Sequence, residues 1–149
     1  MTTYPAFMAV TLVLNALWFG VAFRYFSLTP DTAAKLLVPK SARDSPVFDT
    51  LSASVRFLGG MNCAFAVFAV LLLANRSLFP APQQGALFAA VFAAAHASQF
   101  ICNVPVALKG GRVGESLWPV LRGPMLFIFA TDFVLMVANG VLAAMLLAA

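Results

Sequence analysis

The stretch "QGALFAAVFAAAHASQFICNV", residues 84–104, decides the class of this protein. It contains no acidic, lysine or arginine residue and has about the 20-residue length that a helix needs to cross the apolar core of a bilayer. Three strongly polar side chains nevertheless lie within it, at His96, Gln99 and Asn103. Their spacing of three and four residues places them on one face of a helix. Because an unpaired polar group in hydrocarbon is costly, this face is expected to point toward other helices.

The composition of the whole chain agrees with an integral membrane protein. Hydrophobic residues make up 62% of its 149 residues and charged residues only 9%, whereas a soluble domain has about 25% charged residues. Nine Lys and Arg exceed five Asp and Glu, but the basic residues are scattered between apolar stretches and form no stripe. Nucleic acid is therefore not expected as a partner. The chain is expected to form a single transmembrane domain over residues 1–149.

Three further stretches have the length and composition of a spanning helix. The sequence thus predicts an all-α membrane protein, an antiparallel bundle of four transmembrane helices. Their expected bounds are residues 5–26, 53–74, 84–104 and 120–147. Pro105 lacks a backbone N–H group and is expected to end the third helix. The third and fourth helices are joined by a short loop, so they should pack directly against each other.

The first loop, residues 27–52, contains a second type of helix signal. In "TPDTAAKLLVP", residues 29–39, Thr29 is a candidate N-cap, Pro30 suits the first helical position and Asp31 the first turn. These residues predict a short helix lying at the membrane interface and ending before Pro39. The third loop, residues 105–119, is rich in glycine and is expected to be irregular.

The basic residues predict an orientation in the membrane. Eight of the nine Lys and Arg lie in loops 27–52 and 105–119 or at the adjoining helix ends, and Arg76 alone lies on the other side. The positive-inside rule therefore places these two loops on the cytoplasmic or equivalent side and both termini opposite. Trp18, Tyr25 and Trp118 lie near predicted helix ends and are expected to be interfacial anchors.

Polar residues on the other predicted helices can meet those of residues 84–104. Asp132 is the most informative, because a carboxylate near the bilayer centre costs roughly 2.5–3.5 kcal/mol on insertion scales. It must be protonated or have a donor, and His96 and the asparagines can donate. Asn139 follows seven residues after Asp132. The predicted polar layer comprises Asn15, Asn62, His96, Gln99, Asn103 and Asp132.

Two interpretations of this layer stay open. It is either a hydrogen-bond network that fixes the register of the helices, or a site that handles protons or binds a substrate. In the second case His96 and Asp132 would be the catalytic acid/base pair.

A separate candidate site involves arginines. Arg56, with Arg112 or Arg122, could contact an anionic headgroup or an acidic substrate. The alternative is that Arg56 extends to the interface beside a helix-packing surface made by Gly59 and Gly60.

Several chemistries have no signal in this sequence. There is no HExxH, GxSxG, GxGxxG or P-loop motif, and a lone histidine excludes bis-histidine haem ligation within the chain. Cys63 and Cys102 lack ligand or CxxC spacing, so they are expected to be small buried hydrophobes rather than a disulfide or a metal site. No metal and no cofactor are expected.

Residues 53–147 resemble the Erg28-like proteins and related small four-helix membrane families. The resemblance is carried by "SVRFLGGMNCAF" (residues 54–65), "NRSLF" (75–79) and "FAAAHASQF" (92–100). It implies a scaffold that tethers enzymes of sterol synthesis to a membrane, and it transfers no catalytic residue. The longer basic first loop and Asp132 depart from the family pattern.

The sequence therefore favours a non-enzymatic function. We expect an accessory or scaffold protein that binds membrane lipids and other integral membrane proteins, or a second copy of itself, with a link to sterol or isoprenoid metabolism. The alternative is a small membrane-embedded enzyme that acts on an isoprenoid, sterol or quinone-like substrate with His96 and Asp132. A proton channel is disfavoured, because residues 141–149 are apolar throughout.

Overall fold

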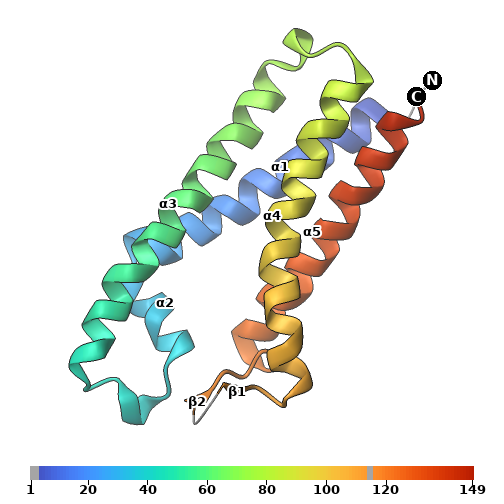
Figure 1. The fold of residues 1–149 in the computed structure, drawn as a ribbon. Helices are drawn as coiled ribbons and strands as arrows, with labels where there is room; N and C mark the ends of the chain where they lie inside the picture. Colours follow the sequence, from blue (N-terminus) through green and yellow to red (C-terminus); the bar gives the residue numbers. More distant parts are fainter. Residues whose placement is uncertain (1–3, 114–115) are drawn as a thin grey trace.

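The computed structural model describes residues 4–113 and 116–149, and most of them are helical (Figure 1). The five α-helices are α1 (Tyr4–Phe23), α2 (Pro30–Leu37), α3 (Pro46–Ala74), α4 (Pro82–Leu108) and α5 (Gly123–Leu147). Four helical segments are long and apolar enough to cross a membrane: Pro5–Leu28, Pro46–Ala74, Pro82–Leu108 and Gly123–Leu147. The predicted all-α class with four such helices is confirmed.

The first apolar helix continues beyond α1 into a π-helical turn, Arg24–Leu28. The short helix predicted in the first loop is present as α2, with Pro30 in its first turn. Thr29 occupies the N-cap position, but its hydroxyl bonds back to the carbonyl oxygens of Arg24 and Tyr25, at 3.4 and 3.3 Å, and does not cap α2.

Helix α3 begins at Pro46, and the predicted start at residue 53 is wrong. Ser45 is the N-cap, and its hydroxyl accepts a hydrogen bond from the backbone N–H of Val47 at 3.3 Å. Pro46 lies in the first turn together with Asp49, whose charge suits the positive end of the helix dipole. The helix thus starts at polar capping residues, ahead of the apolar stretch on which the prediction was based.

Helix α4 continues through Pro105 to Leu108, so the prediction that Pro105 ends it is also wrong. The proline removes one intrahelical hydrogen bond in the last turn, where few bonds remain to be lost. Two glycines with positive φ, Gly110 at 67° and Gly111 at 86°, end the helix instead. The N–H of Gly111 returns to the carbonyl oxygen of Val106 at 2.9 Å, as in a glycine-based helix stop.

The remaining boundaries differ from the prediction for similar reasons. Helix α4 begins at Pro82 rather than residue 84, and the Gln84 side chain accepts a hydrogen bond from the N–H of Ala81 at 3.2 Å. Helix α5 begins at Gly123 rather than residue 120, just before Pro124. The third loop is not wholly irregular, since strand β1 (Arg112–Val113) pairs antiparallel with β2 (Ser116–Leu117).

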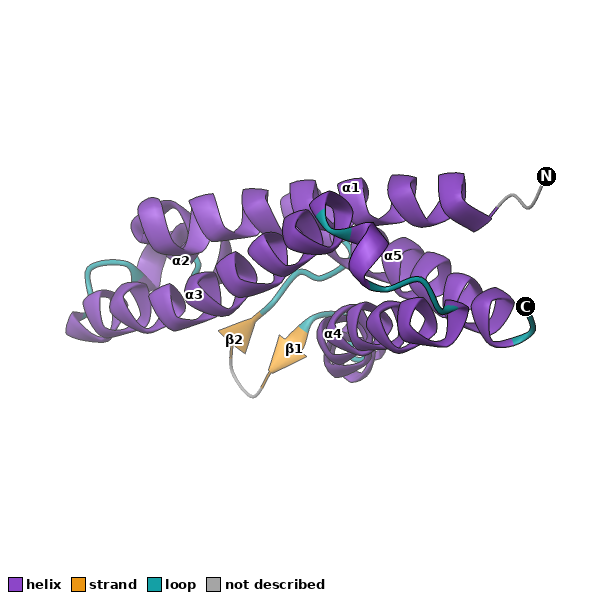
Figure 2. Cartoon of the chain, turned by 90° about the horizontal axis from the view of Figure 1, so that it is seen from above, coloured by secondary structure: helices purple, strands orange, loops and turns teal. Residues whose placement is uncertain are grey.

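The helices pack in pairs that α1 connects. Helix α4 lies along α5, as expected for the third and fourth apolar helices, and α1 lies along α3 and also contacts α5. Figures 1 and 2 show α1 running from the α4–α5 side of the molecule, where it begins, to the α2–α3 side. Figure 1 also places the two termini and the α3–α4 connection toward one end, and α2 and the β1–β2 pair toward the other.

Aromatic rings fill the space where α1, α3 and α4 meet. The buried ring of Phe19 stacks on Phe65 at a centroid distance of 5.0 Å, and Phe68 stacks on Phe92 at 5.6 Å. A second apolar cluster between α4 and α5 consists of Ala86, Ala89, Leu142, Ala143 and Leu146.

Candidate functional site

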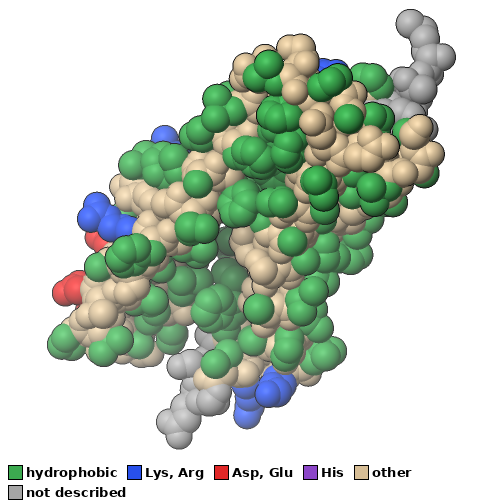
Figure 3. All heavy atoms as spheres, turned by 45° about the horizontal axis from the view of Figure 1, so that its top comes forward, with side chains coloured by type: hydrophobic (Ala, Val, Ile, Leu, Met, Phe, Trp, Pro, Cys, Tyr) green, Lys and Arg blue, Asp and Glu red, His purple; other side chains and the backbone are tan. Residues whose placement is uncertain are grey.

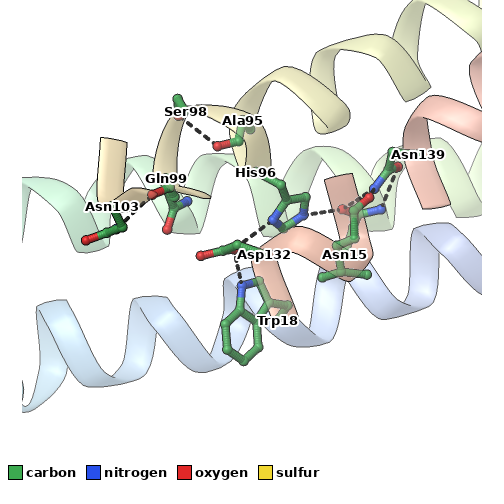
Figure 4. Close-up of polar contacts among 10 residues, drawn as sticks. Asn15, Trp18, Ala95, His96, Ser98, Gln99, Asn103, Asp132 and Asn139 are labelled. Atoms are coloured by element: carbon green, nitrogen blue, oxygen red, sulfur yellow. Dashed lines mark hydrogen bonds and ion pairs between the residues drawn. The ribbon is translucent and has the colours of Figure 1, made fainter. Parts of the chain in front are cut away.

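A buried hydrogen-bond network joins α1, α4 and α5, and His96 lies at its centre (Figure 4). The Nδ1 atom of His96 is 2.9 Å from Oδ1 of Asp132 on α5, and its Nε2 atom is 2.9 Å from Oδ1 of Asn15 on α1. His96 and Asn15 are 0% exposed and Asp132 is 1% exposed. Asp132 therefore faces the protein interior and shares a polar layer with His96, as the energetic argument from sequence requires.

Asn139 extends the network along α5 by pairing with Asn15. The Nδ2 group of Asn15 donates to Oδ1 of Asn139 at 3.0 Å, and the Nδ2 group of Asn139 donates to Oδ1 of Asn15 at 3.3 Å. Each amide also donates to a carbonyl oxygen four residues earlier in its own helix, Thr11 and Leu135 respectively, both at 2.8 Å. Asn139 was absent from the predicted layer, although its seven-residue spacing from Asp132 is a usable signal.

Trp18 is the second member that the predicted layer lacked. Its indole N–H donates to Oδ1 of Asp132 at 3.0 Å, and its ring packs edge-on against Phe127. Trp18 was expected to be an interfacial anchor, but its indole nitrogen bonds to Asp132 inside the protein. On the other side of the network, Phe19 stacks on the imidazole of His96 at a centroid distance of 4.7 Å.

The amide orientations determine the protons on His96. Nδ2 of Asn15 must face the Thr11 carbonyl oxygen, which only accepts, so Oδ1 of Asn15 faces Nε2 of His96 and that nitrogen carries a proton. One further proton lies between Nδ1 and Oδ1 of Asp132. Two arrangements satisfy these bonds: an imidazolium–carboxylate pair, or a neutral imidazole with a carboxylic acid. Both have zero net charge, which avoids an uncompensated buried charge.

Three residues of the predicted layer lie outside the network. Asn62 is buried, but its amide donates to the Leu58 carbonyl oxygen of its own helix at 2.7 Å. Asn103 likewise donates to the carbonyl oxygen of Gln99 at 2.8 Å. The Gln99 side chain lines a cavity beside Trp18 and makes no hydrogen bond to any residue that the structure describes. A polar side chain bonded to its own helix needs no partner on another helix, so a shared face does not ensure a shared network.

The three candidate headgroup arginines are all exposed and belong to different elements. Arg56 lies on α3, Arg112 on β1, and Arg122 is the N-cap of α5. Within residues 4–113 and 116–149, no hydrogen bond or ion pair joins their side chains. The backbone carbonyl oxygen of Arg56 accepts a hydrogen bond from the Ser27 hydroxyl at 3.1 Å. Their joint contact with an anionic group stays a prediction.

The cysteines are not both buried. Neither is fully buried, since Cys63 is half-buried and Cys102 is exposed on the outer face of α4, so the expectation of two buried side chains is wrong. In the part of the chain that the structure describes, no three His, Cys, Asp or Glu residues gather as a metal site would require.

The network is closed chemically. Both nitrogens of His96 already bond to protein atoms, so a substrate atom would have to displace Asn15 or Asp132 to reach the imidazole. The segments that carry the Erg28-like resemblance lie in α3, the turn after it, and α4, and they include His96. No protein-family model, curated protein or solved structure matches this chain, so that resemblance stays a prediction.

Proposed function

We propose that this chain is a small integral membrane accessory or scaffold protein, which binds other membrane proteins and lipid and acts in sterol or isoprenoid metabolism. The observation that carries the proposal is the closed hydrogen bonding of His96, which is 0% exposed and uses both nitrogens within the protein. Such a network fixes α1, α4 and α5 relative to one another and leaves the imidazole no free position for a substrate. The link to sterol or isoprenoid metabolism rests on the family resemblance alone.

The proposed membrane topology is an antiparallel four-helix bundle with α2 at the interface. Loops 27–52 and 105–119 lie on the cytoplasmic or equivalent side, and the termini lie opposite. The charge distribution supports this topology, because eight of nine basic residues fall on one side and Arg76 on the other.

The outer surface supports a binding role. Only 22% to 28% of the residues in the apolar window of each long helix are buried, so most of each helix must contact lipid or another protein. Figure 3 shows hydrophobic side chains over most of one face. Between α1 and α5 lies an open apolar groove of about 510 Å³, whose lining includes Leu17, Ala130 and Val134. A helix of a partner membrane protein would fit against such a groove.

The proposal is tested by purification in mild detergent from the native membrane. We expect the chain to elute in a larger complex with another integral membrane protein at a fixed stoichiometry. A chain that elutes alone or as a self-dimer, with a lipid as its only companion, would contradict the scaffold function.

A matched pair of variants locates the binding surface. Ala130 lines the α1–α5 groove, whereas Ala94 is exposed on α4 away from that groove. Ala130→Trp should release the partner by filling the groove, and Ala94→Trp should retain it. Equal behaviour of the two variants would exclude this groove as the partner surface.

One observation favours the enzyme as a second candidate. In its hydrogen bonds to the described residues Asp132 uses Oδ1 alone, and Figure 4 shows its other oxygen directed away from His96. A substrate that reached this oxygen could exchange a proton with the pair without displacing either partner of the imidazole. The Asp132 substitutions discussed below distinguish the two candidates.

A further inference from the structure

The proposed function names no binding site for lipid, and a cavity of about 500 Å³ lies beside the network. Its walls come from α1 and the π-helical turn that follows it, and from α2, α4 and α5. Four aromatic side chains contribute to them: Trp18, Tyr25, Phe26 and Phe127. Binding pockets for small molecules typically have about 300–1,000 Å³, apolar walls and a few polar groups. This cavity has the size and the lining of such a pocket.

The few polar groups of the cavity are uncharged. Gln99 contributes a side-chain amide that has no hydrogen-bond partner in the described part of the chain, and Thr32 contributes a hydroxyl. Figure 4 shows the Gln99 side chain extending from α4 toward the side on which α1 lies. The amide offers both a donor and an acceptor. A ligand with a hydroxyl or carbonyl group would satisfy it.

The lining also excludes one class of ligand. Among the residues that the structure describes, no Lys, Arg, Asp or Glu lines the cavity. A charged group placed there would lose its hydration without gaining a partner of opposite charge, which is costly. The head of a bound molecule should therefore be neutral, and its apolar part should pack against the aromatic walls.

We propose that this cavity binds a neutral amphiphile, an apolar chain with one hydroxyl or carbonyl head that bonds to the Gln99 amide. The cavity adjoins the α1–α5 groove, with which it shares Trp18, Val21 and Phe127, whereas Ala22 and Gln99 line the cavity alone. Substitutions of Ala22 and Gln99 therefore test ligand binding without changing a residue that lines the proposed partner surface.

Tryptophan fluorescence gives a direct readout of the site. The chain has two tryptophans, and only Trp18 lines the cavity. The buried indole nitrogen of Trp118 has no hydrogen-bond partner among the described residues, so Trp118→Phe removes the second fluorophore without breaking a bond that the structure describes. This variant, in lipid nanodiscs, is titrated with farnesol and with farnesyl diphosphate, which have the same apolar chain and differ in the charge of the head.

We expect a saturable change in Trp18 emission with farnesol and a much weaker one with farnesyl diphosphate. Gln99→Leu should weaken farnesol binding roughly twofold to tenfold, the effect of one lost hydrogen bond. Gln83→Leu, on the exposed first turn of α4, should leave binding unchanged. Ala22→Phe should abolish binding, because its ring would fill the cavity.

Three results would overturn the proposal. The first is the absence of a saturable signal, which is the result if bilayer acyl chains alone occupy the cavity. The second is equal binding of farnesol and farnesyl diphosphate. The third is an equal effect of Gln99→Leu and Gln83→Leu on farnesol binding. If Ala22→Phe fails to fold, the comparison of Gln99→Leu with Gln83→Leu decides the matter by itself.

Discussion

At the scale of single residues, the buried network depends on Asp132 and the hydrogen-bond donors around it. Its Oδ1 atom receives hydrogen bonds from Trp18 and shares a proton with His96 in a site that water does not reach. An unpaired carboxylate at this depth would cost several kcal/mol. The surrounding donors therefore make an acidic residue tolerable on an otherwise apolar helix.

Replacement of Asp132 separates a structural role from a proton-handling role. Asp132→Asn keeps the shape of the side chain, but the atom that replaces Oδ1 can be either the acceptor for Trp18 or the donor for His96, so one hydrogen bond is lost and a decrease of about 0.5–1.5 kcal/mol in the free energy of unfolding is expected. Asp132→Leu leaves both partners unpaired and should lower the free energy of unfolding by about 1–3 kcal/mol. Thermal unfolding in detergent measures both. A variant Asp132→Asn that folds normally but loses an activity of the wild type would support the enzyme instead.

The two tryptophans provide a matched test of the network. Trp18→Phe removes the hydrogen bond to Asp132 and should lower the free energy of unfolding by about 0.5–1.5 kcal/mol. Trp118→Phe removes an indole nitrogen that bonds to none of the residues in 4–113 and 116–149, so no hydrogen-bond loss is expected there. The difference between the two variants, measured by chemical unfolding, reports the bond. Equal destabilisation would show that Trp18 contributes packing alone.

Part of this site could be predicted from residue type and spacing. Asn15, His96 and Asp132 were identifiable because a strongly polar residue on an apolar helix needs a partner. The amides of Asn62 and Asn103 donate to carbonyl oxygens of their own helices, at Leu58 and Gln99. The spacing of residues in the sequence does not predict whether an amide bonds to its own helix or to another one. Trp18 was assigned to the interface because its ring is amphipathic, and only the tertiary structure shows that its N–H points inward.

At the scale of elements, the length of an apolar stretch predicts that a long helix is present, whereas capping residues decide where that helix begins and ends. Ser45, Pro46 and Asp49 form a recognisable helix start ahead of the apolar part of α3. Gly110 and Gly111, rather than Pro105, stop α4. These signals are present in the sequence, but they lie outside the apolar stretches. The extra turns at the start of α3 and at the end of α4 are consequently the main errors of the prediction.

The contact between α3 and the π-helical turn gives an element-scale test. A methyl group at Gly59 would lie 2.6 Å from the backbone nitrogen of Ser27, whereas one at Gly60 would meet nothing within 4 Å. Gly59→Ala should force the two elements apart and cost about 1–3 kcal/mol of stability, as overpacking does. Gly60→Ala should be neutral or stabilising, because alanine favours a helix by up to about 1 kcal/mol. Thermal melts that do not distinguish the two variants would refute this contact.

At the scale of the whole molecule, the order of the helices could be predicted but their spacing could not. Packing of α4 on α5 follows from their consecutive position in an apolar bundle. The connection of α3 to α4 through phenylalanine rings, such as Phe68 with Phe88 and Phe92, depends on side-chain fit that no single-sequence pattern encodes. Neither does the sequence show the cavity that this arrangement leaves between α2 and α5.

The proposed topology predicts the sidedness of three exposed basic residues. After replacement of Cys63 and Cys102 by serine, single variants Lys40→Cys, Arg76→Cys and Lys109→Cys are labelled with a reagent that does not cross membranes. Lys40→Cys and Lys109→Cys should react on one side, and Arg76→Cys on the other. Opposite sides for Lys40→Cys and Lys109→Cys would exclude the four-span arrangement.

In the proposed scaffold function, the His96–Asp132 network holds the helices together and does not react with a substrate. This role is tested most directly by the native mass of wild type and Asp132→Asn, each purified in mild detergent. The account predicts that both elute in the same stoichiometric complex with another membrane protein. A wild-type protein that elutes without such a partner but with a bound lipid, together with loss of that lipid in Asp132→Asn, would contradict it.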